Sequence, residues 1–147
     1  MHAPIHEEFM RIAIEEAERS LAEGNSPVGS IVVRDGEVIA RGRNLVMTTH
    51  DVTAHAETVA LRVAGAAEEA ISFAGCTLYT TYEPCPMCCG AILLAEIATL
   101  VVGAKPEAGG GSWEGYTVEG LIDDLGRSDS IEVIGGVLAE ECASVRS

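Results

Sequence analysis

Residues 76–103 read CTLYTTYEPCPMCCGAILLAEIATLVVG, and this stretch predicts the fold. Its first part, residues 76–81, is rich in β-branched and aromatic residues and indicates a strand. Pro86 suits the first turn of a helix, which we expect over residues 86–96. A second strand is expected at residues 98–103. Because a strand, a helix and a strand with short connections form a parallel crossover unit, we predict an α/β fold with helices packed on the faces of the sheet.

The residues before this unit predict two helices and a β-hairpin. Residues 54–70, AHAETVALRVAGAAEEA, are alanine-rich and helical in pattern. Residues 30–34 and 37–41 are apolar-rich runs joined by Asp35-Gly36, a dipeptide that suits a tight turn. Apolar residues recur at helical spacing over residues 5–24. We therefore expect an amphipathic helix, then two antiparallel strands, then a second helix.

The residues after the unit begin with a glycine-rich loop, KPEAGGGS at residues 105–112, which we expect to form a mobile rim over a site. A weak helix over residues 118–125, a strand at residues 131–134 and a terminal helix from residue 139 to 145 should follow. At 147 residues and 48% hydrophobic composition, the chain suits one domain spanning residues 1–147.

Cysteine usage and hydropathy indicate the compartment. No apolar run approaches ~18 residues, and the N-terminus is too acidic for a signal peptide, so a cytoplasmic location is expected. Three of the five cysteines fall within residues 85–89. In a reducing compartment such spacing favours metal binding or catalysis over a disulfide framework.

The net charge disfavours a nucleic-acid partner. The chain has 23 acidic and 9 basic residues, a formal charge of −14, and Lys105 is its only lysine. A surface that neutralises phosphates needs clustered Lys and Arg, whereas the arginines here are scattered among carboxylates. We therefore expect a small, uncharged substrate, although acidity serves solubility equally well.

A metal-ligand pattern joins two of the expected helices. His55 lies near the start of one, and Cys85 and Cys88 lie three residues apart in the first turn of the other. Two thiolates and one imidazole make three corners of a zinc tetrahedron, and the open fourth corner suits a catalytic site. Zinc lowers the pKa of its bound water from about 15.7 to roughly 7, so the expected nucleophile is a zinc-bound hydroxide.

Glu57 is placed to move protons rather than to bind the metal. The order H-x-E followed by P-C-x-x-C is a known signature of zinc-dependent nucleobase deaminases. A closed structural zinc site is the alternative, with Cys89, Cys76, Cys142 or His50 as fourth ligand. Because Cys85 and Cys89 also share a helix face, we prefer Cys88 only on the signature spacing.

Further motifs extend the pattern along the chain. They are SPVG at 26–29, Asn44, THDVTAHAE at 49–57, LYTTYEPCPMCCGAIL at 78–93, LVVGAK at 100–105 and LAEECA at 138–143. With them the chain resembles the cytidine deaminase superfamily, in its branch of tRNA adenosine deaminases, bacterial guanine deaminases and fungal-type cytosine deaminases. The resemblance implies a three-layer α/β/α fold around a five-stranded mixed sheet, one zinc ion per subunit, and a homodimer or larger assembly.

The resemblance also implies substrate contacts. Asn44 looks like the asparagine that hydrogen-bonds the base, and the backbone around Glu83 and Pro84 looks like the lip that handles the departing amine. Trp113 and Tyr116 stand where an aromatic cap over the base is expected. The alternatives are an ordinary turn residue for Asn44 and core or interface aromatics for Trp113 and Tyr116.

The substrate is predicted from features that point in different directions. SPVG and LAEECA look like tRNA adenosine deaminases, but the charge and the absence of a basic C-terminal extension speak against RNA. EPCPMC looks closer to guanine deaminases, whose longer C-terminal tail is missing. We therefore expect hydrolytic deamination of a free base or analogue, namely guanine, cytosine or an aminotriazine. A tRNA-specific adenosine deaminase and a non-catalytic zinc module are the alternatives.

Overall fold

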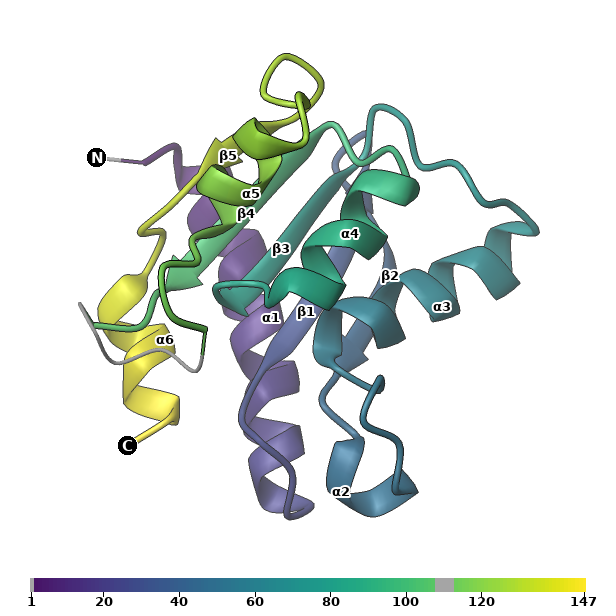
Figure 1. Ribbon diagram of the computed structural model, residues 1–147. Helices are drawn as coiled ribbons and strands as arrows, with labels where there is room; N and C mark the ends of the chain where they lie inside the picture. The colour runs from purple at the N-terminus through teal and green to yellow at the C-terminus, as the bar shows by residue number, and fades with distance from the viewer. Residues whose placement is uncertain (1, 108–112) are drawn as a thin grey trace.

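Five strands form one mixed sheet in the order β2-β1-β3-β4-β5 in the computed structural model, which describes residues 2–107 and 113–147 (Figure 1). β1 pairs antiparallel with β2 and β3, whereas β3, β4 and β5 run parallel. The strands are β1 (Gly29–Arg34), β2 (Glu37–Arg43), β3 (Thr77–Tyr82), β4 (Thr99–Ala104) and β5 (Glu132–Ile134). The predicted hairpin and parallel crossover are confirmed.

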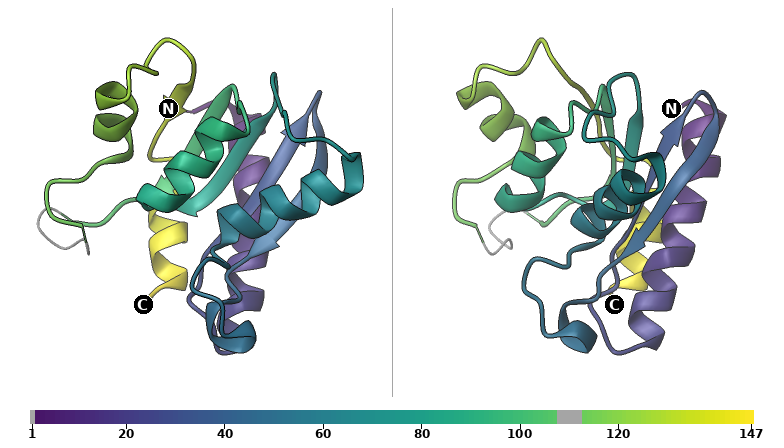
Figure 2. Two further views of the ribbon diagram at one scale, coloured as in Figure 1. Left: turned by 45° about the vertical axis from the view of Figure 1, so that its right-hand side comes forward. Right: turned by 90° about the vertical axis from the view of Figure 1, so that its right-hand side faces the viewer.

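Helices cover both faces of this sheet. They are α1 (Pro4–Ala22), α2 (Val46–Thr49), α3 (Ala56–Glu68), α4 (Pro86–Leu94), α5 (Val118–Asp124) and α6 (Ala139–Val145). α1 and α6 lie on one face, and α3, α4 and α5 lie on the other (Figure 2). The three-layer α/β/α fold is confirmed. The short helix α2 was not predicted, because its four residues give no helical period.

Each face of the sheet has its own hydrophobic core. On β1, Ile31 and Val33 pack with α1, while Val32 packs with the helices of the opposite face. This alternation follows from the period of two along a strand. Because β1, β3 and β4 are covered on both sides, their side chains are almost entirely buried, as is typical of an α/β sheet.

Two glycines allow helices to approach the sheet closely. A Cβ atom at Gly29 would lie 2.0 Å from the Ala13 carbonyl oxygen of α1. At Gly42 of β2 it would lie 2.4 Å from the Ala60 nitrogen and 2.5 Å from the Ala56 oxygen, both on α3. Only glycine fits such contacts. Gly42 therefore sets how deeply the N-terminal half of α3 sits against the sheet.

Two further expectations concern the glycine-rich loop and the absence of a membrane span. The glycine-rich rim predicted at residues 105–112 falls mainly on residues 108–112, which lie outside the described residues. Among the residues that are described, no helix is both long enough and apolar enough to cross a membrane.

Candidate metal centre and active site

Three potential metal ligands converge where α3 and α4 begin. The Nδ1 atom of His55 lies 3.5 Å from the sulfur of Cys85 and 3.5 Å from that of Cys88. The three ligand atoms all lie within 4.8 Å of one another. A tetrahedral zinc ion holds nitrogen at about 2.0–2.1 Å and sulfur at about 2.3 Å, which separates the two by ~3.5 Å. The spacing of this cluster therefore fits zinc.

The two prolines around Cys85 explain its position. A residue before proline avoids the helical region, and Cys85, which precedes Pro86, is extended with φ −70° and ψ 172°. Cys85 is thus the N-cap of α4, and Pro86 opens the helix. Cys88 follows on the same side of the first turn and is fully buried.

Cys89 points elsewhere. It is buried in the hydrophobic core with Ile92 and Leu78, and it does not belong to the ligand cluster. Across residues 2–107 and 113–147, no fourth His, Cys, Asp or Glu joins the three ligands. The geometry therefore favours Cys88 over Cys89 as the third ligand. A cluster of three protein ligands leaves the fourth position for water or substrate, as in catalytic zinc sites.

His55 is the N-cap of α3, with extended φ −72° and ψ 158°. Its carbonyl oxygen accepts a hydrogen bond from the Thr58 hydroxyl at 3.0 Å. Glu57 follows in the first turn, is only 3% exposed and lines the same cavity as His55. Because Glu57 lies outside the ligand cluster but beside it, its placement suits proton transfer rather than metal binding.

The charges of the cluster interact strongly. A hydrogen bond from the Cys88 thiol, together with His55, lowers the pKa of Cys85 to about 4. The hydrogen bond with Cys85 in turn raises the pKa of His55. Burial raises the pKa of Glu57 to about 7. Cys85 is therefore a thiolate at neutral pH, which is the form that binds a metal.

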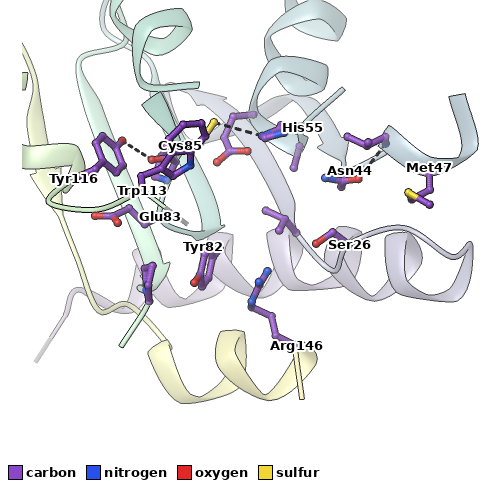
Figure 3. A pocket seen from close by; sticks show the side chains of 16 residues that line it. Ser26, Asn44, Met47, His55, Tyr82, Glu83, Cys85, Trp113, Tyr116 and Arg146 are labelled. Carbon is purple, nitrogen blue, oxygen red and sulfur yellow. Dashed lines mark hydrogen bonds between the residues drawn. The ribbon is translucent and has the colours of Figure 1, made fainter. Parts of the chain in front are cut away.

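A cavity of about 480 Å³ opens onto the cluster (Figure 3). Side chains from both halves of the chain surround it, including Ser26, Asn44, Met47, Tyr82, Glu83, Trp113, Tyr116 and Arg146. Apart from His55, Arg146 is the single basic residue that lines it within the described chain. The Arg146 guanidinium stacks on the Tyr82 ring, 3.9 Å from its centroid. Arg146 and Tyr82 were not singled out from the sequence.

Asn44 lies in this cavity, as expected, and its orientation is fixed. The hydroxyl of buried Ser20 donates a hydrogen bond to the main-chain carbonyl oxygen of Asn44 at 2.8 Å. The backbone N–H of Val46 donates to its side-chain oxygen at 3.1 Å. These contacts leave the amide NH₂ of Asn44 as the group free to contact a ligand. Ser20 has no sequence signal, because the bond joins residues 24 positions apart.

The other predicted substrate contacts, Glu83, Pro84 and Trp113, also line the cavity. They differ in whether another part of the chain already binds them. The Glu83 carboxylate accepts a hydrogen bond from the Val118 N–H at 3.1 Å, so it is engaged by α5. The Pro84 carbonyl accepts one from the Tyr116 hydroxyl at 2.5 Å. Trp113 is 56% exposed and lines the cavity rather than the core.

Comparison with known proteins identifies a matching family and several relatives. The cytidine and deoxycytidylate deaminase zinc-binding region matches residues 3–104. The tRNA-specific adenosine deaminase of Bacillus subtilis (strain 168) is 39% identical over 139 residues, which cover 95% of this chain and 84% of that protein. The chloroplastic tRNA(adenine(34)) deaminase of Arabidopsis thaliana is 48% identical over 111 residues, or 74% of this chain, but this match covers only 8% of that protein.

Solved structures give the same picture of the fold. A structure from a study of A-to-I editing by tRNA:A34 deaminases has a TM-score of 0.80 at 34% identity, covering 94% of this chain and 98% of that one. A guanine deaminase from Nitrosomonas europaea has a TM-score of 0.81 at 29% identity, covering 99% and 84%. The two TM-scores are nearly equal, so similarity of fold does not distinguish a tRNA deaminase from a guanine deaminase. Sequence identity is higher with the tRNA deaminases.

These relatives correct two expectations. The prediction of a free base such as guanine, cytosine or an aminotriazine is wrong, and so is the prediction that nucleic acid is an unlikely partner. The charge argument failed because net charge does not say where charges lie. Glu57 and Glu83 are the cavity's carboxylates within the described chain; the Glu57 residue is 3% exposed and the Glu83 side chain is 5% exposed. Arg146 also lines the cavity.

Proposed function

Because this chain belongs to the cytidine and deoxycytidylate deaminase family of zinc-dependent enzymes, we propose that it hydrolyses the amino group of an adenosine in tRNA. The products are inosine and ammonia. The relatives named above, at 39% and 48% identity, support this substrate over a free base. The observation that carries the catalytic part is the three-ligand cluster that shares one cavity with the buried carboxyl group of Glu57.

His55, Cys85 and Cys88 are the proposed ligands of one zinc ion per subunit. When bound there, zinc supplies the positive charge that lowers the pKa of a water molecule to roughly 7. Glu57 takes the proton of the attacking water and delivers it to a ring nitrogen of the base. The Glu57 carboxylate then takes the second proton from the hydroxyl oxygen that is now bonded to the ring carbon, and passes it to the leaving nitrogen as the bond between that nitrogen and the ring carbon breaks. One water is consumed and one ammonia is released.

The remaining groups orient the base. The free NH₂ of Asn44 donates a hydrogen bond to an acceptor atom on the purine, since its side-chain oxygen is already engaged by Val46. The carbonyl oxygen of Pro84 accepts an N–H of the departing amine. The exposed ring of Trp113 stacks on the base, because a π-face at the cavity rim suits an unpaired nucleotide.

Arg146 is the proposed contact for the RNA backbone. It is the cavity's one arginine within the described residues, and stacking on Tyr82 holds its guanidinium at the edge of the site. A fixed guanidinium suits a phosphate oxygen beside the nucleotide that enters the cavity. This contact would give the substrate affinity a dependence on salt concentration.

Assembly and location complete the proposal. We propose a homodimer of single-domain subunits, supported by exposed apolar side chains on α3 and α4, namely Val63, Met87 and Leu94. A cytoplasmic location is supported by the five cysteines, none of which forms a disulfide bond.

The test measures ammonia release by the zinc-loaded protein from an adenosine-containing tRNA anticodon stem-loop, guanine, cytosine and an aminotriazine. Glu57→Gln serves as the control for contaminating deaminases. We expect turnover of the stem-loop alone, and none by the variant. Turnover of a free base without turnover of the RNA would contradict the proposed substrate. Turnover that survives in the variant would contradict the proposed role of Glu57.

A further inference from the structure

The two residues that precede Cys85 are held by a segment from a distant part of the chain, residues 113–119. The Tyr116 hydroxyl donates to the Pro84 carbonyl oxygen at 2.5 Å, and the Val118 N–H donates to the Glu83 carboxylate at 3.1 Å. Lys105 adds a charge contact to the same carboxylate at 3.9 Å. Figure 3 shows the Tyr116 side chain reaching across to the backbone beside Cys85.

Tyr116 itself is well supported in this position. Its backbone N–H donates to the Trp113 carbonyl oxygen at 3.2 Å, which closes a turn. Its half-buried ring packs against the core that contains Cys89 and Val118. Thr117 then caps α5, because its hydroxyl accepts the Gly120 N–H at 3.0 Å. Burial also raises the pKa of the Tyr116 phenol, so the hydroxyl remains a donor.

The accepting carbonyl belongs to a rigid peptide unit. The peptide bond between Pro84 and Cys85 is planar, so fixing the direction of its oxygen fixes the orientation of the whole plane. A carbonyl oxygen has two lone pairs, and Tyr116 uses one of them. The second remains for a donor in the cavity, because Pro84 lines that cavity beside Cys85.

We propose that Tyr116 is a positioning residue that aims the Pro84 carbonyl oxygen at the amino group of the substrate. This inference rests on the proposed function, in which that carbonyl accepts an N–H of the departing amine. The bond strengthens as the leaving nitrogen gains a proton and positive charge, so the carbonyl stabilises the transition state more than the bound substrate. Tyr116 never touches the substrate in this role. It prevents the peptide plane from turning away.

The variant Tyr116→Phe keeps the ring and removes the hydroxyl. We expect kcat to fall about 10-fold, the usual upper range for one neutral hydrogen bond, with KM and zinc content unchanged. Tyr79→Phe is the matched control. Its hydroxyl is hydrogen-bonded to His6 at 2.8 Å, and its ring lies in the core on the opposite face of the sheet. A loss of stability alone would therefore appear in both variants.

The decisive readout compares two leaving groups at the same position of one RNA stem-loop. Adenosine loses ammonia, whereas 6-methoxypurine riboside loses methanol, and both give inosine with one water consumed. The methoxy group has no N–H to donate. We therefore expect the 10-fold loss in Tyr116→Phe on adenosine and less than about 2-fold on the methoxy substrate.

The outcomes distinguish a failure of the positioning role of Tyr116 from a failure of the proposed RNA substrate. The expected difference between leaving groups supports the positioning role. An equal loss on both substrates, or wild-type kcat on adenosine, overturns it even when the wild-type protein edits the RNA. If the wild-type protein converts only a free base, the proposed RNA substrate fails. The amino and methoxy forms of that base then decide the role of Tyr116 by the same comparison.

Discussion

Substitution of Gly42 by alanine tests whether the seating of α3 on the sheet sets the geometry of the active site. The added Cβ atom would lie 2.4 Å from the Ala60 nitrogen and 2.5 Å from the Ala56 oxygen, where ordinary contacts begin near 3.4 Å. Both obstacles are backbone atoms that cannot rotate away. The difference between 3.4 and 2.4 Å means that α3 must move by about 1.0 Å. Ala56 lies between His55 and Glu57, so the metal ligand and the proton carrier must move with it.

The expected losses follow from this displacement. Overpacking of this kind destabilises a protein by about 1–3 kcal/mol. A displacement of ~1 Å at catalytic groups costs on the order of 100-fold in rate. We therefore expect Gly42→Ala to fold with a lower melting temperature, to bind zinc more weakly and to lose about 100-fold in kcat/KM for inosine formation.

Gly90→Ala is the matched control on the neighbouring helix α4. A Cβ atom there meets no heavy atom within 4 Å. Replacing glycine by alanine inside a helix stabilises it by about 0.5–1 kcal/mol, so this variant should melt slightly higher and keep its activity. Calorimetry, zinc analysis and a timed inosine assay on both variants give the comparison. Wild-type zinc affinity and rate in Gly42→Ala would refute the argument that this contact positions the site.

Three further predictions concern side chains of the site itself. Glu57→Gln should retain zinc and the fold but lose at least about 100-fold in kcat, because a proton carrier is removed and no ligand is lost; a rate near wild type would argue against that role. Cys88→Ala should lose zinc while Cys89→Ala keeps it, and metal analysis of the purified proteins would show the reverse if Cys89 were the ligand. Arg146→Ala should weaken stem-loop binding and lower its salt dependence by about one counterion, whereas an unchanged salt slope would exclude a phosphate contact.

The periodic parts of the chain could be predicted from the sequence. The β1–β2 hairpin, the β3–α4–β4 crossover and the final helix α6 (Ala139–Val145) appear where alternating or helical apolar patterns place them. The helix expected over residues 54–70 is shorter and begins at Ala56, because His55 is extended and serves as its N-cap. The four-residue helix α2 has no pattern of its own. Its position depends on contacts with Asn25, whose side-chain oxygen accepts the Met47 and Thr48 N–H groups.

The site was predictable where its chemistry lies in short motifs and unpredictable where it depends on long-range contacts. Spacing alone could not separate Cys88 from Cys89, since both lie on a face shared with Cys85. The structure favours Cys88, because Cys89 packs into the core whereas Cys88 lies with His55 and Cys85. Arg146 reaches the cavity only because α6 packs beside the end of β3, a contact between residues 64 positions apart. The net charge was a misleading guide to the substrate, because a sum of charges over the sequence does not show where those charges lie in the fold.

The most direct test of the proposed function is the mass of the product nucleoside after the zinc-loaded protein acts on an unmodified tRNA in water labelled with a heavy oxygen isotope. Hydrolysis at the amino-bearing carbon predicts inosine that carries one heavy oxygen at the former amino position, formed by the wild-type protein and absent with Glu57→Gln. Adenosine that remains unchanged in the RNA, while the same protein sample releases ammonia from a free base, would contradict the account.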